Sequence, residues 1–129
     1  MIGRCESPEV KVLVIEDDRM LRESLCEALQ LEGFVVDGVE NGEAGLRYLR
    51  ERGRPCVILL DLMMPVMDGW TFRREALKDP SLAEIPVVVM TATRPEREPL
   101  APVQAILAKP LQMEVVVDEL QKHCPLRVA

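Results

Sequence analysis

Aromatic residues make up only 3% of this sequence of 129 residues, so aliphatic side chains must fill any core. Histidine is almost absent as well. The single one, His123, lies near the end of the chain, far from any acidic cluster. The four cysteines show no Cys-x-x-Cys spacing, and neither a glycine-rich phosphate loop nor a nucleophile-elbow serine is present. These absences argue against a zinc protein and against a nucleotide enzyme.

Positive charge and long apolar runs are also lacking. The formal net charge is −6, which argues against a nucleic-acid partner and against an anionic membrane surface. No stretch approaches the roughly 20 apolar residues that span a bilayer. Residues 1–9 contain no apolar signal-peptide core, so we expect a cytoplasmic protein without a membrane partner. In that compartment the cysteines are expected to be reduced thiols. They are Cys5, Cys26, Cys56 and Cys124.

Strand-like and helix-like patterns alternate along the chain. This alternation predicts an α/β fold in which one parallel sheet carries helices on both faces. We expect residues 1–9 to form a flexible tail, residues 10–124 one domain, and residues 125–129 a short C-terminal tail. The expected strands cover residues 10–15, 34–38, 56–60, 86–90 and 103–107, and the clearest helices cover residues 19–31, 42–50, 69–78 and 111–123.

One segment breaks this rhythm. Residues 91–102, between the fourth and fifth predicted strands, contain Pro95, Pro99 and Pro102. Pro95 could begin a helix, but Pro99 would remove one of its hydrogen bonds. We therefore predict a shortened fourth helix of one or two turns at most.

Carboxylates follow two of the predicted buried strands. Glu16, Asp17 and Asp18 come directly after the first strand, and Asp61 ends the third. Acids at the carboxyl ends of neighbouring parallel strands repel each other and resist desolvation, so they call for a cation. Oxygen ligands of this kind suit Mg²⁺, with the Met63 carbonyl as a plausible extra ligand. Asp18 is predicted instead to cap the helix that follows.

Asp61 closes an unbroken apolar run, where aspartate is disfavoured. A turn or capping role is the alternative, but Asp68 already supplies the cap of the next helix. We interpret Asp61 as a carboxylate nucleophile that forms an acyl phosphate. Thr91 and Lys109 end two further apolar runs, and a hydroxyl and an ammonium there could bind phosphoryl oxygens.

Together these residues resemble the receiver domain of bacterial two-component response regulators, in particular single-domain receivers like the chemotaxis response regulators. The resemblance covers about residues 10–123. It is carried by four motifs: Val14-Ile-Glu-Asp-Asp18, Leu60-Asp-Leu-Met-Met-Pro-Val-Met-Asp-Gly69, Met90-Thr-Ala92 and Ala108-Lys-Pro110. It implies a flavodoxin-like, doubly wound five-stranded sheet of order 2-1-3-4-5, in which the first and third strands are neighbours.

The resemblance also implies a role for each site residue. Asp61 is the phosphoacceptor, and Mg²⁺ is held by Glu16, Asp17, Asp61 and the Met63 carbonyl. Thr91, Ala92 and Lys109 bind the phosphoryl group and take part in the conformational switch. A cis peptide bond precedes Pro110. The chain departs from the family at Ile106, where receivers usually carry the aromatic ring of their switch, and in its shortened fourth helix.

We therefore expect a stand-alone receiver. It takes a phosphoryl group from a sensor histidine kinase or histidine phosphotransfer protein and signals to a downstream protein partner by conformational change. Two alternatives are a Mg²⁺-dependent aspartyl phosphohydrolase and a phosphate-blind interaction module. Met63 argues against the phosphohydrolase, because haloacid-dehalogenase phosphatases need a second acid at this position. The intact set of acids, threonine and lysine argues against an interaction module that does not use phosphate.

Overall fold

A five-stranded parallel sheet lies at the centre of the computed structural model, which describes residues 12–92 and 102–124. The strand order is β2-β1-β3-β4-β5, as predicted, so the direction of winding reverses between β1 and β3. Every neighbouring pair is parallel. The strands are β1 (Val12–Ile15), β2 (Val36–Val39), β3 (Val57–Asp61), β4 (Val87–Thr91) and β5 (Ala105–Ala108).

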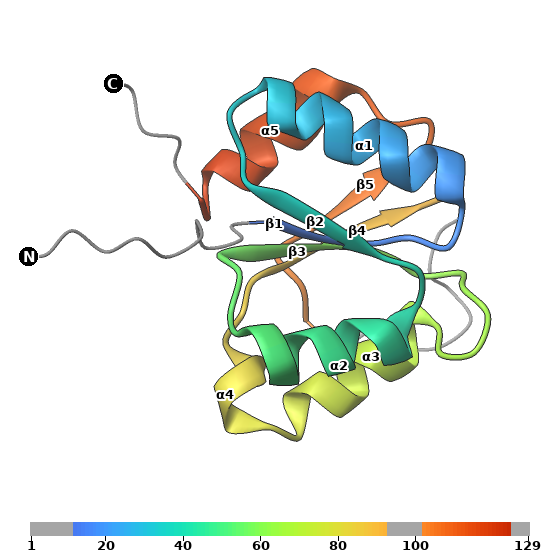
Figure 1. Ribbon diagram of the computed structural model, residues 1–129, viewed down its shortest axis with the longest axis vertical. Coiled ribbons are helices and arrows are strands. Elements are labelled where there is room, and N and C mark those ends of the chain that lie inside the picture. The colour runs from blue at the N-terminus through green and yellow to red at the C-terminus, as the bar shows by residue number, and fades with distance from the viewer. Residues whose placement is uncertain (1–11, 93–101, 125–129) are drawn as a thin grey trace, which may run out of the picture.

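Helices cover both faces of the sheet, as expected for parallel strands (Figure 1). Two of them, α1 and α5, lie on one face, and the other three described helices lie on the opposite face. The helices are α1 (Arg19–Leu31), α2 (Gly42–Arg52), α3 (Gly69–Leu77), α4 (Pro80–Ala83) and α5 (Met113–Gln121).

Short polar residues begin three of these helices. The side chains of Asp18, Asn41 and Asp68 each accept a hydrogen bond from the backbone N–H three residues later. Such caps satisfy donors that the first turn of a helix leaves unpaired. The capping roles predicted for Asp18 and Asp68 are confirmed.

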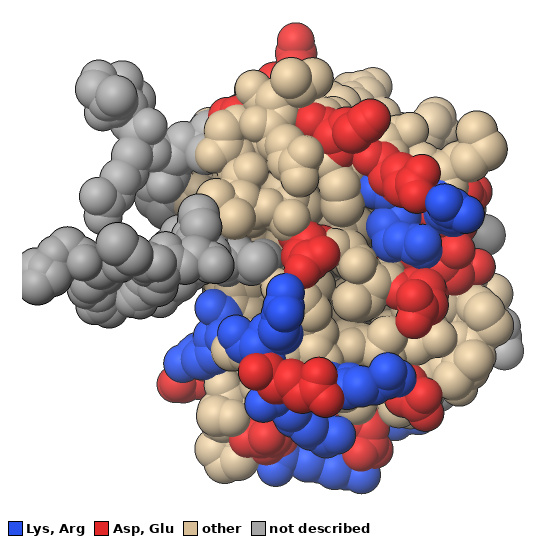
Figure 2. All heavy atoms as spheres, in the orientation of Figure 1, with Lys and Arg blue, Asp and Glu red and all other residues tan. Residues whose placement is uncertain are grey.

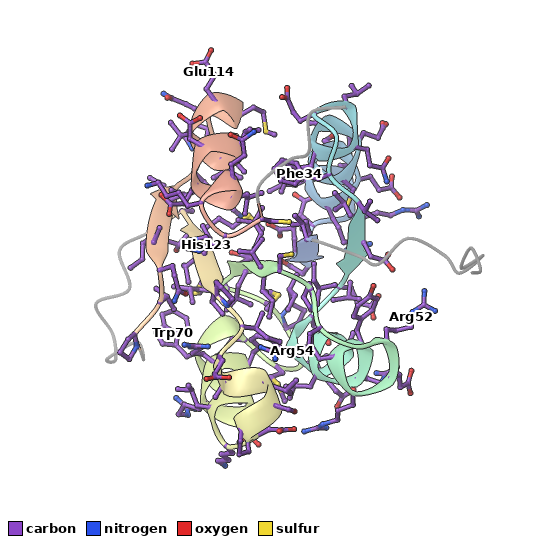
Figure 3. The ribbon with its side chains drawn as sticks, turned by 90° about the vertical axis from the view of Figure 1, so that its left-hand side faces the viewer. Phe34, Arg52, Arg54, Trp70, Glu114 and His123 are labelled. Atoms are coloured by element: carbon purple, nitrogen blue, oxygen red, sulfur yellow. The ribbon has the colours of Figure 1, made fainter. Side chains whose placement is uncertain are left out.

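Alternate residues of the central strands pack into two separate cores. In β1, Val12 and Val14 face the layer of α1 and α5, whereas Leu13 and Ile15 face the layer of α2, α3 and α4. Both faces are therefore apolar, which explains why these strands read as continuous hydrophobic runs. Figure 3 shows Phe34 and Trp70 on opposite sides of the sheet, each in one core.

The structure differs from the sequence prediction in some bounds and in one helix. The strand predicted at residues 34–38 is found at Val36–Val39, and that predicted at 103–107 at Ala105–Ala108. The prediction missed α4, although Asp79 caps it and Pro80 stands in its first turn, both typical start signals. The shortened fourth helix expected within residues 91–102 falls mainly on 93–101, outside the described residues, as do the tails 1–9 and 125–129.

Charged side chains of both signs interleave over the layer of α2 to α4 (Figure 2). Arg47 lies 3.6 Å from Glu43, and Arg52 lies 3.9 Å from Asp37. These pairs are exposed, so each contributes little to stability. Among the described residues, none of the helices has both the length and the apolar content that a membrane crossing requires.

One loop residue adopts a costly backbone conformation. Val66, between β3 and α3, has a φ of 69° and is 77% exposed. A β-branched residue in the left-handed region costs about 1–3 kcal/mol, whereas glycine costs about 0.5–1 kcal/mol in backbone entropy. Val66→Gly is therefore expected to raise the free energy of unfolding by about 0.5–1.5 kcal/mol in urea titration. Val66→Ala keeps a Cβ and should gain much less; an equal gain would contradict a backbone origin.

Candidate functional site

The register of the sheet brings two acids to the same level. Ile15 of β1 pairs with Leu60 of β3, so the next residues, Glu16 and Asp61, stand side by side where the two strands end. On the other side of β3, Thr91 of β4 pairs with Ala108 of β5. Lys109 follows directly, and its backbone N–H donates a hydrogen bond of 2.9 Å to the Thr91 carbonyl. The carboxyl edge at the switch point thus collects all four residues.

Three carboxylates form one cluster at this edge. Oxygen atoms of Glu16, Asp17 and Asp61 all lie within 4.8 Å of one another. Glu16 and Asp61 are 1% and 3% exposed, whereas Asp17 is exposed. The cluster is therefore buried on one side and open to solvent at Asp17. Its all-oxygen donor set fits a hard divalent cation such as Mg²⁺.

Lys109 supplies the positive charge next to this cluster. Its ammonium Nζ lies 2.9 Å from Glu16 Oε1 and 3.5 Å from Asp61 Oδ1. Of these two contacts, the one with Glu16 is the shorter. Burial lowers the pKa of Lys109, yet the contacts with Glu16 and Asp61 outweigh burial and leave this pKa above its ordinary value.

Both the side chain and the backbone of Glu16 accept further hydrogen bonds. Its second carboxylate oxygen, Oε2, accepts a hydrogen bond of 3.0 Å from the backbone N–H of Asp18. The guanidinium of Arg22 donates a hydrogen bond of 2.8 Å to the Glu16 carbonyl. Sequence reasoning missed Arg22, because an arginine on an amphipathic helix gives no sign that it reaches back to a strand end.

The Asp61 carboxyl is strongly perturbed. Burial, followed by the negative charge of Glu16, raises its pKa from 3.8 to about 7. Lys109 and a hydrogen bond from the backbone of Met63 act in the opposite direction but do not cancel the rise. A nearby cation would lower this raised pKa, because added positive charge stabilises the ionised form of the carboxyl.

The remaining predicted residues differ in their exposure to solvent. Thr91 is 5% exposed at the end of β4, and Ala92 after it is exposed. Met63 and Ile106 are 50% and 49% exposed, and the Lys109–Pro110 peptide bond is cis. His123 lies apart from them on the α5 side, with its Nε2 3.7 Å from a carboxylate oxygen of Glu119.

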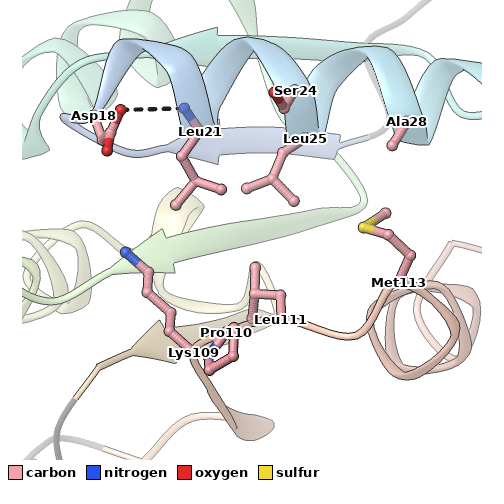
Figure 4. A pocket seen from close by; sticks show the side chains of 9 residues that line it. All are labelled: Asp18, Leu21, Ser24, Leu25, Ala28, Lys109, Pro110, Leu111 and Met113. Carbon is pink, nitrogen blue, oxygen red and sulfur yellow. Dashed lines mark hydrogen bonds between the residues drawn. The ribbon is translucent and has the colours of Figure 1, made fainter.

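An apolar groove of about 540 Å³ adjoins the cluster (Figure 4). Asp18 and Lys109 stand at one end of it, and Ala28 and Met113 at the other. One wall comes from α1, and the other from the residues that join β5 to α5 and from Met113, the first residue of α5. The apolar lining consists of Leu21, Leu25, Ala28, Pro110, Leu111 and Met113.

Comparison with known proteins gives a consistent family. The model of the response regulator receiver domain matches residues 12–121. The response regulator MprA of Mycolicibacterium vanbaalenii is 31% identical over 116 residues, which cover 87% of this chain and 49% of that protein. The transcriptional regulatory protein HprR of Escherichia coli is 36% identical over 83 residues, 64% of this chain and 35% of that protein. The chain thus spans about half the length, or less, of these curated relatives.

Solved structures agree with this result. The chemotaxis protein CheY4 of Vibrio cholerae has a TM-score of 0.80 and 27% identity, and the match covers 90% of this chain and 99% of that one. The receiver domain of a sensor histidine kinase from Pseudomonas aeruginosa has a TM-score of 0.79 and 29% identity, covering 91% and 98%. That structure contains a magnesium ion coordinated in its active site cleft.

Proposed function

Because this chain belongs to the family of response regulator receiver domains of two-component systems, we propose that it accepts a phosphoryl group on Asp61 in a Mg²⁺-dependent reaction. The observation that carries the proposal is the position of Asp61 between Glu16 and Lys109 at the switch point of the sheet. In this proposal the chain is a signalling domain, and its only chemistry is its own phosphorylation and slow dephosphorylation.

The proposed donor is a phosphohistidine of a sensor histidine kinase or of a histidine phosphotransfer protein. An Asp61 carboxylate oxygen forms the new bond to phosphorus while the bond from phosphorus to the imidazole nitrogen breaks, and the released imidazole takes a proton from solvent. This transfer depends mainly on positioning and charge neutralisation. Burial of Asp61 keeps competing water away from one side of the reacting carboxylate.

Each charged group at the site has a part in this transfer. Glu16, Asp17, Asp61 and the Met63 carbonyl would hold Mg²⁺, which supplies positive charge to the phosphoryl oxygens. Lys109 neutralises charge on the other side of the same group, while Thr91 and Ala92 bind its remaining oxygens. Lys109 contacts both Glu16 and Asp61, two of the carboxylates of this set.

The apolar groove supports a protein as donor rather than a small molecule alone. It opens next to Lys109 and Asp18, so a helix seated there would present its histidine close to Asp61. Signal output is proposed to pass to a downstream protein partner in the cytoplasm, through movement of the segment that follows Thr91. The net charge of −6 favours protein partners over nucleic acid or membrane.

The test is direct phosphorylation by a small-molecule donor. We expect the protein incubated with acetyl phosphate and Mg²⁺ to gain the mass of one phosphoryl group, measured on the intact chain. Asp61→Asn is expected to gain none, because an amide cannot form the acyl phosphate. The matched control is Asp118→Asn, which removes an exposed carboxyl on α5 and should be phosphorylated like the wild type.

Three results would contradict the proposal. Equal phosphorylation of Asp61→Asn and wild type would place the phosphoryl group elsewhere. Catalytic release of phosphate from added phosphomonoesters would indicate a phosphohydrolase, and a complete lack of reaction in the presence of Mg²⁺ would indicate an interaction module that does not use phosphate.

The phosphorylated form is expected to be long-lived. Met63 lies two residues after Asp61 and is half exposed, but a thioether is a poor hydrogen-bond acceptor for an attacking water. Met63→Asn introduces an amide there and should speed the loss of the phosphoryl group about three- to tenfold, the value of one hydrogen bond in the transition state. Intact-mass measurements after removal of acetyl phosphate give both rates. Decay of the wild type within seconds would contradict this expectation.

A further inference from the structure

Met63 combines exposure with closeness to the reacting carboxylate. Its side chain is 50% exposed, and its backbone forms a hydrogen bond to Asp61. Met20, Met64 and Met90 each lack one of these two properties. Met20 is 79% exposed but lies in the first turn of α1, whereas Met64 is 9% exposed and Met90 is fully buried.

Exposed methionines react with peroxides. Hydrogen peroxide transfers one oxygen atom to the thioether sulfur, which forms a sulfoxide, and the peroxide leaves as water. The sulfur is oxidised by two electrons and the peroxide is reduced by two, so no further reagent is needed. Burial shields Met64 and Met90 from this reaction, but not Met63 or Met20.

We propose that Met63 is an oxidation site through which a peroxide shortens the lifetime of phosphorylated Asp61. The proposal rests on the phosphoacceptor function proposed above. A sulfoxide oxygen is a polar acceptor, unlike the thioether it replaces, so it can hold a water molecule beside the acyl phosphate. Oxidation thereby supplies a group for hydrolysis that the unmodified side chain lacks, and the phosphoryl signal ends sooner.

The backbone hydrogen bond to Asp61 places Met63 where its side chain can act in this way. Because the Met63 backbone is hydrogen-bonded to the Asp61 carboxylate, the Met63 side chain starts next to the position of the acyl phosphate. Met20 begins on another element, beyond the capping residue Asp18. Met20 is therefore expected to be oxidised as readily as Met63 but without an effect on the phosphorylated form.

The experiment uses the full chain. The protein is treated with hydrogen peroxide, the excess is removed with catalase, and a thiol reductant restores reversibly oxidised cysteines while leaving sulfoxides intact. Peptide masses then locate the added oxygen atoms. Treated and untreated samples are phosphorylated with acetyl phosphate and Mg²⁺, desalted and followed by intact mass.

We expect the oxidised wild type to lose its phosphoryl group about three- to tenfold faster than the untreated protein. Met63→Leu keeps the backbone N–H and carbonyl and should show no acceleration after peroxide, whereas Met20→Leu should show it in full. Treatment with methionine sulfoxide reductases should restore the slow decay of the oxidised wild type.

The outcomes separate this inference from the proposed function. Equal lifetimes before and after oxidation, an acceleration that persists in Met63→Leu, or peptide masses without oxygen on Met63 would each overturn the redox role while leaving phosphorylation of Asp61 in place. Failure of the untreated wild type to accept any phosphoryl group would instead overturn the proposed function and the inference with it.

Discussion

Asp61→Asn is expected to raise the free energy of unfolding of the metal-free protein at pH 8 by about 1–3 kcal/mol. The reason is the pKa of Asp61, which burial and the neighbouring Glu16 raise to about 7 in the folded chain. Ionised Asp61 is therefore unfavourable in the fold. The asparagine side chain has almost the same shape but never carries the charge.

The sign of the pH dependence follows from this shift. Between its ordinary pKa of 3.8 and about 7, the folded state keeps a proton on Asp61 that the unfolded state has already lost. The stability of the metal-free wild type should therefore fall as pH rises through this window, and the contribution of Asp61 should be constant above it. Asp61→Asn should lack this fall, so the two proteins should differ most above pH 7 and least near pH 4.

Urea unfolding in the presence of a chelator at pH 4, 6 and 8 measures this difference. Asp118→Asn is the matched control, because it removes an exposed carboxyl and should behave like the wild type at each pH. Added Mg²⁺ should stabilise the wild type more than Asp61→Asn, since a ligand stabilises the state that binds it. If Asp61→Asn were less stable than the wild type at pH 8 without metal, ionised Asp61 would not destabilise the fold.

Gly69→Ala is expected to lower the free energy of unfolding by about 2–3 kcal/mol. Gly69 is the first residue of α3, and its N–H donates a hydrogen bond of 2.9 Å to the Leu62 carbonyl. A Cβ at this position would lie 2.7 Å from the Asp61 carbonyl oxygen and 2.8 Å from the Leu62 Cα. Both are backbone atoms at the end of β3, so neither can turn aside, and α3 must move away from the site.

Gly45→Ala in α2 provides a comparison. Its added Cβ would lie 2.6 Å from Ile15 Cδ1, the end of a flexible side chain, and alanine favours the helix by about 1 kcal/mol over glycine. The loss at Gly45 should therefore be clearly smaller than at Gly69 in the same urea titration. Equal losses at the two positions would mean that contact with the strand backbone is not what excludes a side chain at Gly69.

Local sequence patterns predict much of the fold. The buried runs of β1, β3 and β4 are rich in branched aliphatic residues because both faces of these strands are covered. The capping residues Asp18, Asn41 and Asp68 mark helix starts through their own short-range hydrogen bonds. The short helix α4 was missed, since four residues are too few to show a periodic apolar face.

The acids of the candidate site could also be anticipated, because a carboxylate that closes an apolar strand is rare enough to be informative. Their partners could not. The chain alone does not show that Arg22 holds the Glu16 carbonyl or that Lys109 lies closer to Glu16 than to Asp61. Such preferences depend on how side chains reach across the sheet between β1 and β5, and the local sequence pattern carries no information about this.

The sequence by itself therefore determined which segments form strands and helices, and which polar residues end them, because these properties depend on neighbours a few positions away. Only the tertiary structure decided that Glu16 and Lys109, 93 residues apart, meet at 2.9 Å, and that the pKa of Asp61 rises to about 7. Both results come from strand register and burial, which exist only once distant segments have packed together and excluded water.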